Sequence, residues 1–230
     1  MKAMILAAGL GTRMRPLTLH TPKPLLKVGG KALIVWHLER LAASGITQVV
    51  INHAWLGEQL EAELGNGQAW GLDISYSAET EPLETGGGIL KALPQLITDA
   101  DDRFLVINAD VFCDLDLRLF IDTPLLEQDL GVLLMVDNPD WHVQGDFKLD
   151  ARSYLQTEKG RSLTFSGISV LKGRLFDACQ PGRFALAPLF RQAIANQRLR
   201  GVYHAGRWSD VGTPERLYQL DQQLGEELIE

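Results

Sequence analysis

The first forty residues constrain this chain most, because a buried-strand pattern runs directly into a glycine-rich, basic loop. The apolar run 4–8 (MILAA) has the length of one buried β-strand, and segment 9–16 (GLGTRMRP) follows it. Gly9 and Gly11 allow backbone N–H groups to approach a ligand closely, and the cationic Lys23 lies a few residues beyond. The combination predicts an anion-binding site at the end of a strand.

Positive charge is concentrated at this end of the chain. Residues 1–38 contain six lysines and arginines and no acidic residue, whereas the whole chain has 22 basic and 29 acidic residues and a net charge of −7. The remainder is therefore strongly acidic. A polyphosphate would be attracted to the N-terminal region, while the net charge argues against nucleic acid as the main partner.

Two common nucleotide-binding motifs do not fit the loop. Met14 stands where a dinucleotide fingerprint has its third glycine, and no Gly-Lys-Ser or Gly-Lys-Thr of a P-loop occurs in the chain. A Rossmann dehydrogenase would need an acidic residue about twenty positions after the glycines, but the first is Glu39, beyond a proline-rich stretch. A tight turn without a ligand is the remaining alternative for the glycines alone.

Composition indicates one large α/β domain. With 230 residues and 46% apolar content, the chain can bury an ample core. The apolar N-terminal run is too short for a signal sequence, and no later segment is long enough to span a membrane. Cys113 and Cys179 lack metal-ligand spacing, so we expect reduced thiols in a cytoplasmic protein. The five histidines form no metal or triad spacing either, and we expect structural or solvent-facing roles for them.

Strand-like and helical patterns alternate along the chain. The expected strands are 48–52, 73–77, 104–108, 130–136 and 163–171, and the expected helices are 31–44, 56–64, 186–196 and 215–224. A further helix is expected to start near Ile89. This alternation favours a mostly parallel sheet covered by helices on both faces.

Two aspartates follow strand-like or turn-like segments far apart in the sequence. Asp110 comes directly after the apolar strand 104–108, at the sheet edge where such folds bind ligands. Asp210 lies within segment 208–214 (WSDVGTP), whose Thr213 and Pro214 suit the start of a helix. A helix-capping or turn role is the alternative for Asp110.

The motifs GLGTRMRPLT, PKPLL, NAD at 108–110 and WSDVGTP closely resemble, in this order, those of the sugar-1-phosphate nucleotidyltransferases. These enzymes make nucleotide sugars from a nucleoside triphosphate. The resemblance implies a Rossmann-like three-layer α/β/α fold with a mostly parallel mixed sheet, of the GT-A-like nucleotidyltransferase type. It also implies a single catalytic domain, with residues 1–125 mainly binding the nucleotide and 126–230 mainly the sugar phosphate.

The resemblance assigns roles to the matching residues. Asp110 and Asp210 are implied to bind Mg²⁺, the cofactor that we expect, because magnesium takes one or two carboxylates beside substrate oxygens. Arg13, Lys23 and Asp110 are the implied catalytic residues, with Arg13 on the β- and γ-phosphates and Lys23 at the α-phosphate or the sugar phosphate. The implied triphosphate-binding residues around them, together with a nucleotide-binding asparagine, are Ala8, Gly9, Gly11, Thr12 and Asn108.

Segment 81–88 (EPLETGGG) resembles the nucleoside-binding stretch Pro-Leu-Gly-Thr-Ala-Gly of relatives. Glu81, Gly86 and Gly87 are therefore expected to contact the base and ribose. Glu84 replaces a usual glycine, and Gly86 replaces a usual alanine. A flexible turn is the alternative.

Several short segments resemble the sugar-binding part of the family. Gly145, Asp146, Glu158 and Gly167 are implied to contact the sugar phosphate, although Asp146 could equally be a solvated surface residue. Within the family, the roughly 230-residue length together with LETGGG and GDF looks most like the N-acetylmuramate-1-phosphate uridylyltransferases of cell-wall recycling, which implies UTP as the nucleotide. The candidates to bind a lactyl carboxylate are Lys159, Arg161 and Arg207.

Other functions stay open from the sequence. A mannose-1-phosphate guanylyltransferase or a glucose-1-phosphate thymidylyltransferase would differ only in base and sugar. A regulator that binds nucleotide sugars without catalysis is the alternative of another class, although Lys23, Asp110 and Asp210 are all present. The sequence does not define the oligomeric state.

Overall fold

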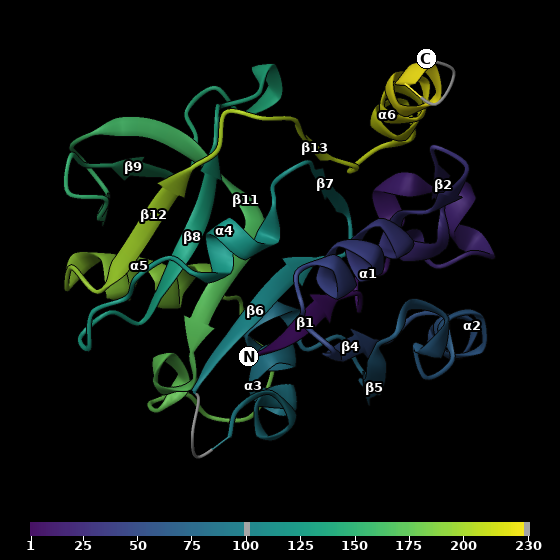
Figure 1. Cartoon of the computed structure of the whole chain (residues 1–230), viewed down its shortest axis with the longest axis horizontal. Helices are drawn as coiled ribbons and strands as arrows, with labels where there is room; N and C mark the ends of the chain where they lie inside the picture. The colour runs from purple at the N-terminus through teal and green to yellow at the C-terminus, as the bar shows by residue number, and fades with distance from the viewer. Residues whose placement is uncertain (99–101, 228–230) are drawn as a thin grey trace.

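The computed structural model describes residues 1–98 and 102–227, and it contains a nine-stranded central sheet (Figure 1). One half of the sheet is parallel and has the order β5, β4, β1, β6, with β1 in the middle. These strands are Lys2–Leu6 (β1), Gln48–His53 (β4), Asp73–Ala78 (β5) and Arg103–Asn108 (β6). Their carboxyl ends therefore meet at one edge.

The other half of the sheet is mixed. Its long strand β11 (Arg161–Lys172) runs antiparallel to β6 and to β8 (Gly131–Val136), and β12 (Leu199–Tyr203) pairs parallel with β8. Two short strands, β9 (Phe147–Leu149) and β10 (Leu155–Gln156), extend the sheet beyond β11. The expected mostly parallel mixed sheet is confirmed: the half nearest the N-terminal loop is parallel, and the antiparallel pairs of β11 make the sheet mixed.

Helices cover both faces of the sheet, as predicted (Figure 1). Helices α1, α2 and α4 pack on one face, while α3 and α5 pack on the other. The helices are Leu33–Ala43 (α1), Gly57–Leu64 (α2), Glu84–Leu96 (α3), Leu117–Ile121 (α4), Ala187–Ala195 (α5) and Pro214–Glu227 (α6). The short 3-10 turns are Thr12–Met14 (η1), Leu17–Leu19 (η2), Lys23–Leu25 (η3), Gln68–Trp70 (η4), Asp140–His142 (η5) and Gly173–Phe176 (η6).

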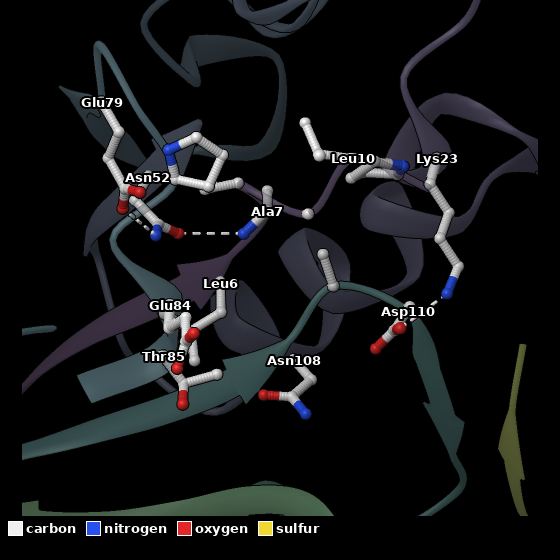
Figure 2. A pocket seen from close by; sticks show the side chains of 15 residues that line it. Leu6, Ala7, Leu10, Lys23, Asn52, Glu79, Glu84, Thr85, Asn108 and Asp110 are labelled. Carbon is white, nitrogen blue, oxygen red and sulfur yellow. Dashed lines mark hydrogen bonds and ion pairs between the residues drawn. The ribbon is translucent and has the colours of Figure 1, made fainter. Parts of the chain in front are cut away.

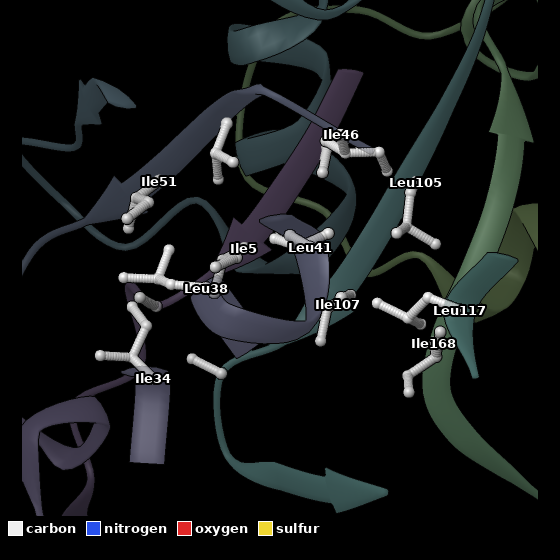
Figure 3. Close-up of a cluster of buried hydrophobic side chains, with 14 of the residues drawn as sticks. Ile5, Ile34, Leu38, Leu41, Ile46, Ile51, Leu105, Ile107, Leu117 and Ile168 are labelled. Atoms are coloured by element: carbon white, nitrogen blue, oxygen red, sulfur yellow. The ribbon is translucent and has the colours of Figure 1, made fainter. Parts of the chain in front are cut away.

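Strand alternation explains why both faces need helices. Side chains of a strand point alternately to opposite faces, so a strand buried on both sides is apolar throughout. In β1, Ile5 faces the α1 side and Met4 faces the α3 side. Figure 3 shows Ile5 and Ile107 of the sheet against Leu38 of α1.

A third apolar cluster joins the N-terminal loop to the C-terminal helix. Met14 and Val28 pack with Phe112 of β7 (Val111–Cys113) and with Leu220 of α6. β2 (Lys27–Val28) and β3 (Lys31–Ala32) form a two-stranded ribbon here, and β7 pairs antiparallel with β13 (Trp208–Asp210). This cluster packs together the segments that carry the charged residues of the site described below.

Some local predictions differ from the structure. The first strand ends at Leu6, two residues earlier than the apolar run, because the chain turns away from the sheet there. Helix α3 begins at Glu84, so Gly86–Gly88 lie inside it rather than ahead of it. The β7–β13 ribbon and β12 were not predicted, because each is too short or too polar to show a strand period. In the described part of the chain, no helix is long and apolar enough to cross a membrane.

We expect Leu38→Ala to lower the free energy of unfolding by about 2–5 kcal/mol, because Leu38 is fully buried between α1 and the sheet. Chemical denaturation measures this loss. Leu119→Ala is the control, since that side chain is 74% exposed, and its effect should stay within about 0.5 kcal/mol. Equal losses in the two variants would contradict the packing described here.

Candidate active site

The site begins at the carboxyl end of β6, beside the end of β1. Asn108 pairs in register with Leu6, and the Ala109 N–H donates to the Leu6 carbonyl (3.0 Å). The chain then leaves the sheet, which puts Asp110 at its edge. Asn108 and Asp110 therefore lie at the carboxyl edge of the parallel strands, where folds of this kind bind ligands.

The β7–β13 ribbon brings Asp210 to Asp110 from a hundred residues away. Asp210 pairs with Val111, the residue after Asp110, and the Val211 N–H donates to the Asp110 carbonyl (2.9 Å). Both carboxylates consequently lie at the same end of one short ribbon.

Each of these carboxylates has a cation as partner. Lys23 Nζ lies 2.6 Å from Asp110 Oδ2, and Arg216 Nη1 lies 2.8 Å from Asp210 Oδ2. Burial raises the pKa of Asp210, and the charge of Asp110 raises it further, whereas Lys23, Arg216 and Arg13 act in the opposite direction. Burial and mutual repulsion make it unfavourable to keep two carboxylates this close. Together they form a set of oxygen donors that suits a hard divalent cation.

Three cavities surround Asp110, and it lines all of them. The sheet-edge cavity, of about 310 Å³, lies between the ends of β1 and β4 and the start of α3 (Figure 2). The tryptophan cavity, of about 350 Å³, is lined by Trp141 and Trp208. The loop cavity, of about 320 Å³, is lined by residues 9–14 and Gly212. The Asp110 side chain thus lies where the three cavities meet.

The glycine-rich loop, for which the sequence predicts anion binding, lines the loop cavity. Gly11 has φ +61°, and a Cβ there would come within 2.9 Å of Thr18 Cγ2, so both its conformation and its packing require glycine. The Thr18 hydroxyl donates to the Gly11 carbonyl (2.7 Å) and fixes the turn. Thr12 and Arg13 line this cavity, and Arg13 also lines the tryptophan cavity. Ala8 and Gly9 line the sheet-edge cavity.

A buried hydrogen-bond chain forms the far wall of the sheet-edge cavity (Figure 2). The Ala7 N–H donates to Asn52 Oδ1 (2.9 Å), and Asn52 Nδ2 donates to Glu79 Oε1 (2.7 Å). Glu79 Oε2 in turn accepts from the Leu83 N–H (2.8 Å). Asn52 and Glu79 were not predicted from the sequence, although both lie at the carboxyl end of a parallel strand, as Asn108 does: Asn52 is the second-last residue of β4, and Glu79 follows β5 directly.

The residues predicted for nucleoside binding in segment 81–88 lie elsewhere than expected. Glu81 is exposed and is not part of the sheet-edge cavity lining; Glu84 and Thr85 line it instead. Gly86 and Gly87 are buried in α3, where a Cβ would meet Phe184 Cε2 (2.4 Å) and the Gly182 carbonyl (2.2 Å). These glycines therefore allow α3 to pack closely on the 182–184 segment.

The tryptophan cavity contains two of the four residues predicted to contact a sugar. Gly167 has φ +84° at a register shift in β11, and a Cβ there would lie 2.8 Å from Asn108 Nδ2. Asp146 accepts from the Phe165 N–H (2.8 Å) and pairs with His142 Nε2 (3.1 Å), so it braces the wall formed by η5. β11 can approach Asn108 closely because Gly167 has no side chain.

The other predicted acceptor-side residues lie outside this lining. Gly145 has φ +64°, and its close neighbours are Asn138 and Leu163, which makes it a turn residue. Glu158 is exposed, and its carbonyl accepts from Lys148 Nζ (2.7 Å). Lys159, Arg161 and Arg207, the candidates for a lactyl carboxylate, do not line the cavity either.

A histidine and a cysteine also meet near the ribbon, at its other end from the aspartates. His204 Nε2 lies 2.7 Å from Asp114 Oδ1, and ligand atoms of these two residues and Cys113 lie within 4.8 Å of one another. Burial raises the pKa of the Cys113 thiol to about 11, so it stays protonated near neutral pH. The hydrogen bond between His204 and Asp114 joins the end of β12 to the end of β7. Sequence spacing could not reveal it, because the partners are 90 residues apart.

Comparison with known proteins identifies the family. The family model described as nucleotidyl transferase matches residues 2–138. The chain belongs to the nucleotidyl transferase family. Members of this family generally use a divalent metal, and a nucleoside triphosphate and a sugar-1-phosphate are substrates that fit it.

Individual relatives resemble the chain over most of its length. It is 48% identical to an N-acetylmuramate alpha-1-phosphate uridylyltransferase of Neisseria meningitidis, over 98% of this chain and 99% of that one. It is 32% identical to a mannose-1-phosphate guanyltransferase of Gibberella zeae, over 94% of this chain and 62% of the relative. A Bacillus anthracis structure assigned as a glucose-1-phosphate thymidylyltransferase has the same fold, with a TM-score of 0.86 at 22% identity, covering 98% and 95% of the two chains.

We expect Mg²⁺ to raise the Tm of the wild type, and Asp110→Asn and Asp210→Asn to remove most of that rise. At a concentration about 100-fold above Kd, binding stabilises the fold by about 2.7 kcal/mol, which raises Tm by about 5–10 °C for a chain of this size. Differential scanning calorimetry measures the shift. Because the pKa of Asp210 is raised, its proton competes with the cation, so the shift shrinks as the pH falls.

Asp122→Asn is the matched control, because Asp122 is exposed at the end of α4. It should keep the full magnesium-induced shift. A full shift in both Asp110→Asn and Asp210→Asn would place the cation elsewhere.

Proposed function

We propose that this protein transfers a uridylyl group from UTP to N-acetylmuramate-1-phosphate and releases pyrophosphate, as a step of cell-wall recycling. The observation that carries the proposal is 48% identity, over nearly the full length of both chains, to the Neisseria meningitidis relative of that name. The three cavities that meet at Asp110 support it, because the reaction needs a nucleoside, a triphosphate and a sugar phosphate held around one point.

Each cavity suits one part of the substrates. The sheet-edge cavity, with Asn52, Glu79 and Thr85, would hold the base and ribose, whose polar edges need fixed hydrogen-bond partners. The loop cavity would hold the triphosphate beside Arg13. The tryptophan cavity would hold the sugar, because an exposed aromatic ring such as Trp141 offers an apolar face as well as a polar edge.

Asp110 and Asp210 are the residues that would hold Mg²⁺, and their carboxylates fit it because magnesium prefers oxygen ligands. When bound, the cation would neutralise charge on the reacting phosphates. Lys23 would then be available to the α-phosphate or the sugar phosphate, since its present partner Asp110 would serve the cation.

The reaction needs no general base. A sugar-1-phosphate has a second pKa of about 6, so one of its phosphate oxygens is already anionic near neutral pH. This oxygen would attack the α-phosphorus in line, and the bond from the α-phosphorus to the oxygen of the departing pyrophosphate would break. Ser166 and His142 both line the tryptophan cavity, but in the described structure His142 pairs with Asp146, and Ser166 Oγ accepts from the Ile168 N–H.

Charge repulsion is the barrier that the side chains must lower. Two unit charges about 4 Å apart repel by about 4 kcal/mol at an effective dielectric near 20, which corresponds to about a thousandfold in rate. Lys23 and Arg13 border the loop cavity and would offset this repulsion, Arg13 toward the departing phosphates and Lys23 toward the α-phosphate.

A guanylyltransferase acting on mannose-1-phosphate is the second candidate, favoured by 32% identity to the Gibberella zeae relative. The chain spans 62% of that relative's length, compared with 99% for the Neisseria protein. For an acidic sugar, Arg13 in the tryptophan cavity lining is the candidate partner, since the three candidates taken from the sequence lie outside that lining.

A substrate matrix tests the proposal. Pyrophosphate release is measured for UTP, dTTP, GTP, CTP and ATP, each with N-acetylmuramate-, N-acetylglucosamine-, glucose- and mannose-1-phosphate in the presence of Mg²⁺. We expect UTP with the muramate to give the highest kcat/KM. A different dominant pair would replace the named substrates, and nucleotide binding without turnover in any pair would favour a non-catalytic regulator.

We expect Lys23→Ala to lower kcat by about 10²–10³-fold without unfolding the protein, because the variant removes a preorganised cation. Steady-state kinetics at saturating substrates measures the loss. The control is Lys27→Ala, four residues away and exposed, which should retain wild-type kcat. A kcat within tenfold of wild type for Lys23→Ala would refute this electrostatic role.

A further inference from the structure

Arg216 makes two contacts that belong to different parts of the site. Its Nη1 lies 2.8 Å from Asp210 Oδ2, and its Cζ lies 3.8 Å from the ring centre of Trp141. Asp210 belongs to the carboxylate pair at the ribbon, whereas Trp141 lines the tryptophan cavity. No role for Arg216 is expected from the sequence, because an arginine in the first turn of a helix offers no signal for one.

The backbone of Arg216 is held in place by the packing of helix α6. Helix α6 packs into the third apolar cluster through Leu220 and Leu224, and Asp221 Oδ1 accepts from the Gly29 N–H (2.8 Å). A Cβ on Gly212 would lie 3.0 Å from Arg216 Nη1 and 3.1 Å from Asp210 Oδ1. Glycine at this position therefore avoids crowding the ion pair between Arg216 and Asp210. Arg216 therefore extends from a fixed helix along a defined path.

One side chain in the wall of the tryptophan cavity, Trp141, is half-exposed. Trp141 is 49% exposed in the short turn η5, and its ring centre lies 6.4 Å from that of Trp208. Trp208 is fixed by a hydrogen bond from its Nε1 to the Ser166 carbonyl (2.8 Å). The guanidinium of Arg216 contacts this half-exposed ring of Trp141 through a cation–π interaction.

We propose that Arg216 is a positioning residue that couples the two halves of the site, by fixing the Asp210 carboxylate and the Trp141 ring with one guanidinium. Cation binding at Asp210 and sugar-phosphate binding against Trp141 then strengthen each other through this side chain. The inference rests on the proposed function, because it takes the tryptophan cavity to be the acceptor cavity.

The planar guanidinium explains why arginine is needed here. Its edge donates to the carboxylate while its face stacks on the indole, so both contacts hold at once. A lysine would keep the charge near Asp210 but would offer no flat surface to Trp141. Arg216→Lys therefore separates the two contacts.

Isothermal titration calorimetry tests the coupling without turnover. The Kd of N-acetylmuramate-1-phosphate is measured with and without Mn²⁺, in the absence of nucleotide, and the ratio of the two values is the coupling factor. We expect Arg216→Gln to lower this factor by about fivefold. Trp141→Leu should lower it by a similar amount, and the double variant should fall no further than either single variant.

Two further variants keep the result interpretable. Arg216→Lys should bind Mn²⁺ with an affinity close to that of wild type and still lose coupling. Arg118→Gln is the control, because Arg118 pairs with Asp116 at an exposed position on α4, and its coupling factor should equal that of wild type.

Three outcomes would overturn the inference: an unchanged factor in Arg216→Gln, multiplicative losses in the double variant, or full coupling in Arg216→Lys. Failure of the wild type to bind N-acetylmuramate-1-phosphate at all would instead count against the proposed function. The two failures are therefore distinguishable.

Discussion

The pairing of β7 with β13 is the contact on which the rest of this site depends. It places Asp210 beside Asp110 although like charges repel and burial raises the pKa of Asp210. Such a pair is retained at a cost to the free protein, so its proximity is itself a functional signal. The ribbon thereby brings a second carboxylate, Asp210, into the lining of one of the three cavities that meet at Asp110.

The surrounding structure offsets that cost in two ways. Lys23 and Arg216 each contact one of the two carboxylates, from opposite ends of the chain. The third apolar cluster fixes the segments that carry Lys23 and Arg216, because it packs the N-terminal loop, β7 and α6 together. Burial of these apolar side chains thus supplies the rigidity that the charged groups cannot provide for themselves.

The sequence predicted those features that local patterns determine. Strands β4, β5, β6, β8 and β11 follow apolar runs, and Asp110 follows directly from its strand. Asp210 was identified through a resemblance rather than through periodicity, because the ribbon that positions it is only three residues long. Residues such as Asn52 and Arg216 act through contacts across the sheet or between distant elements, and no spacing along the chain reports such contacts.

The most direct test of this account is the location of Mn²⁺ in crystals grown with a non-hydrolysable UTP analogue, found from its anomalous scattering. The account predicts a manganese peak in direct contact with carboxylate oxygens of both Asp110 and Asp210, beside the phosphates of the analogue. A peak that contacts only one of these carboxylates, or neither, would contradict it.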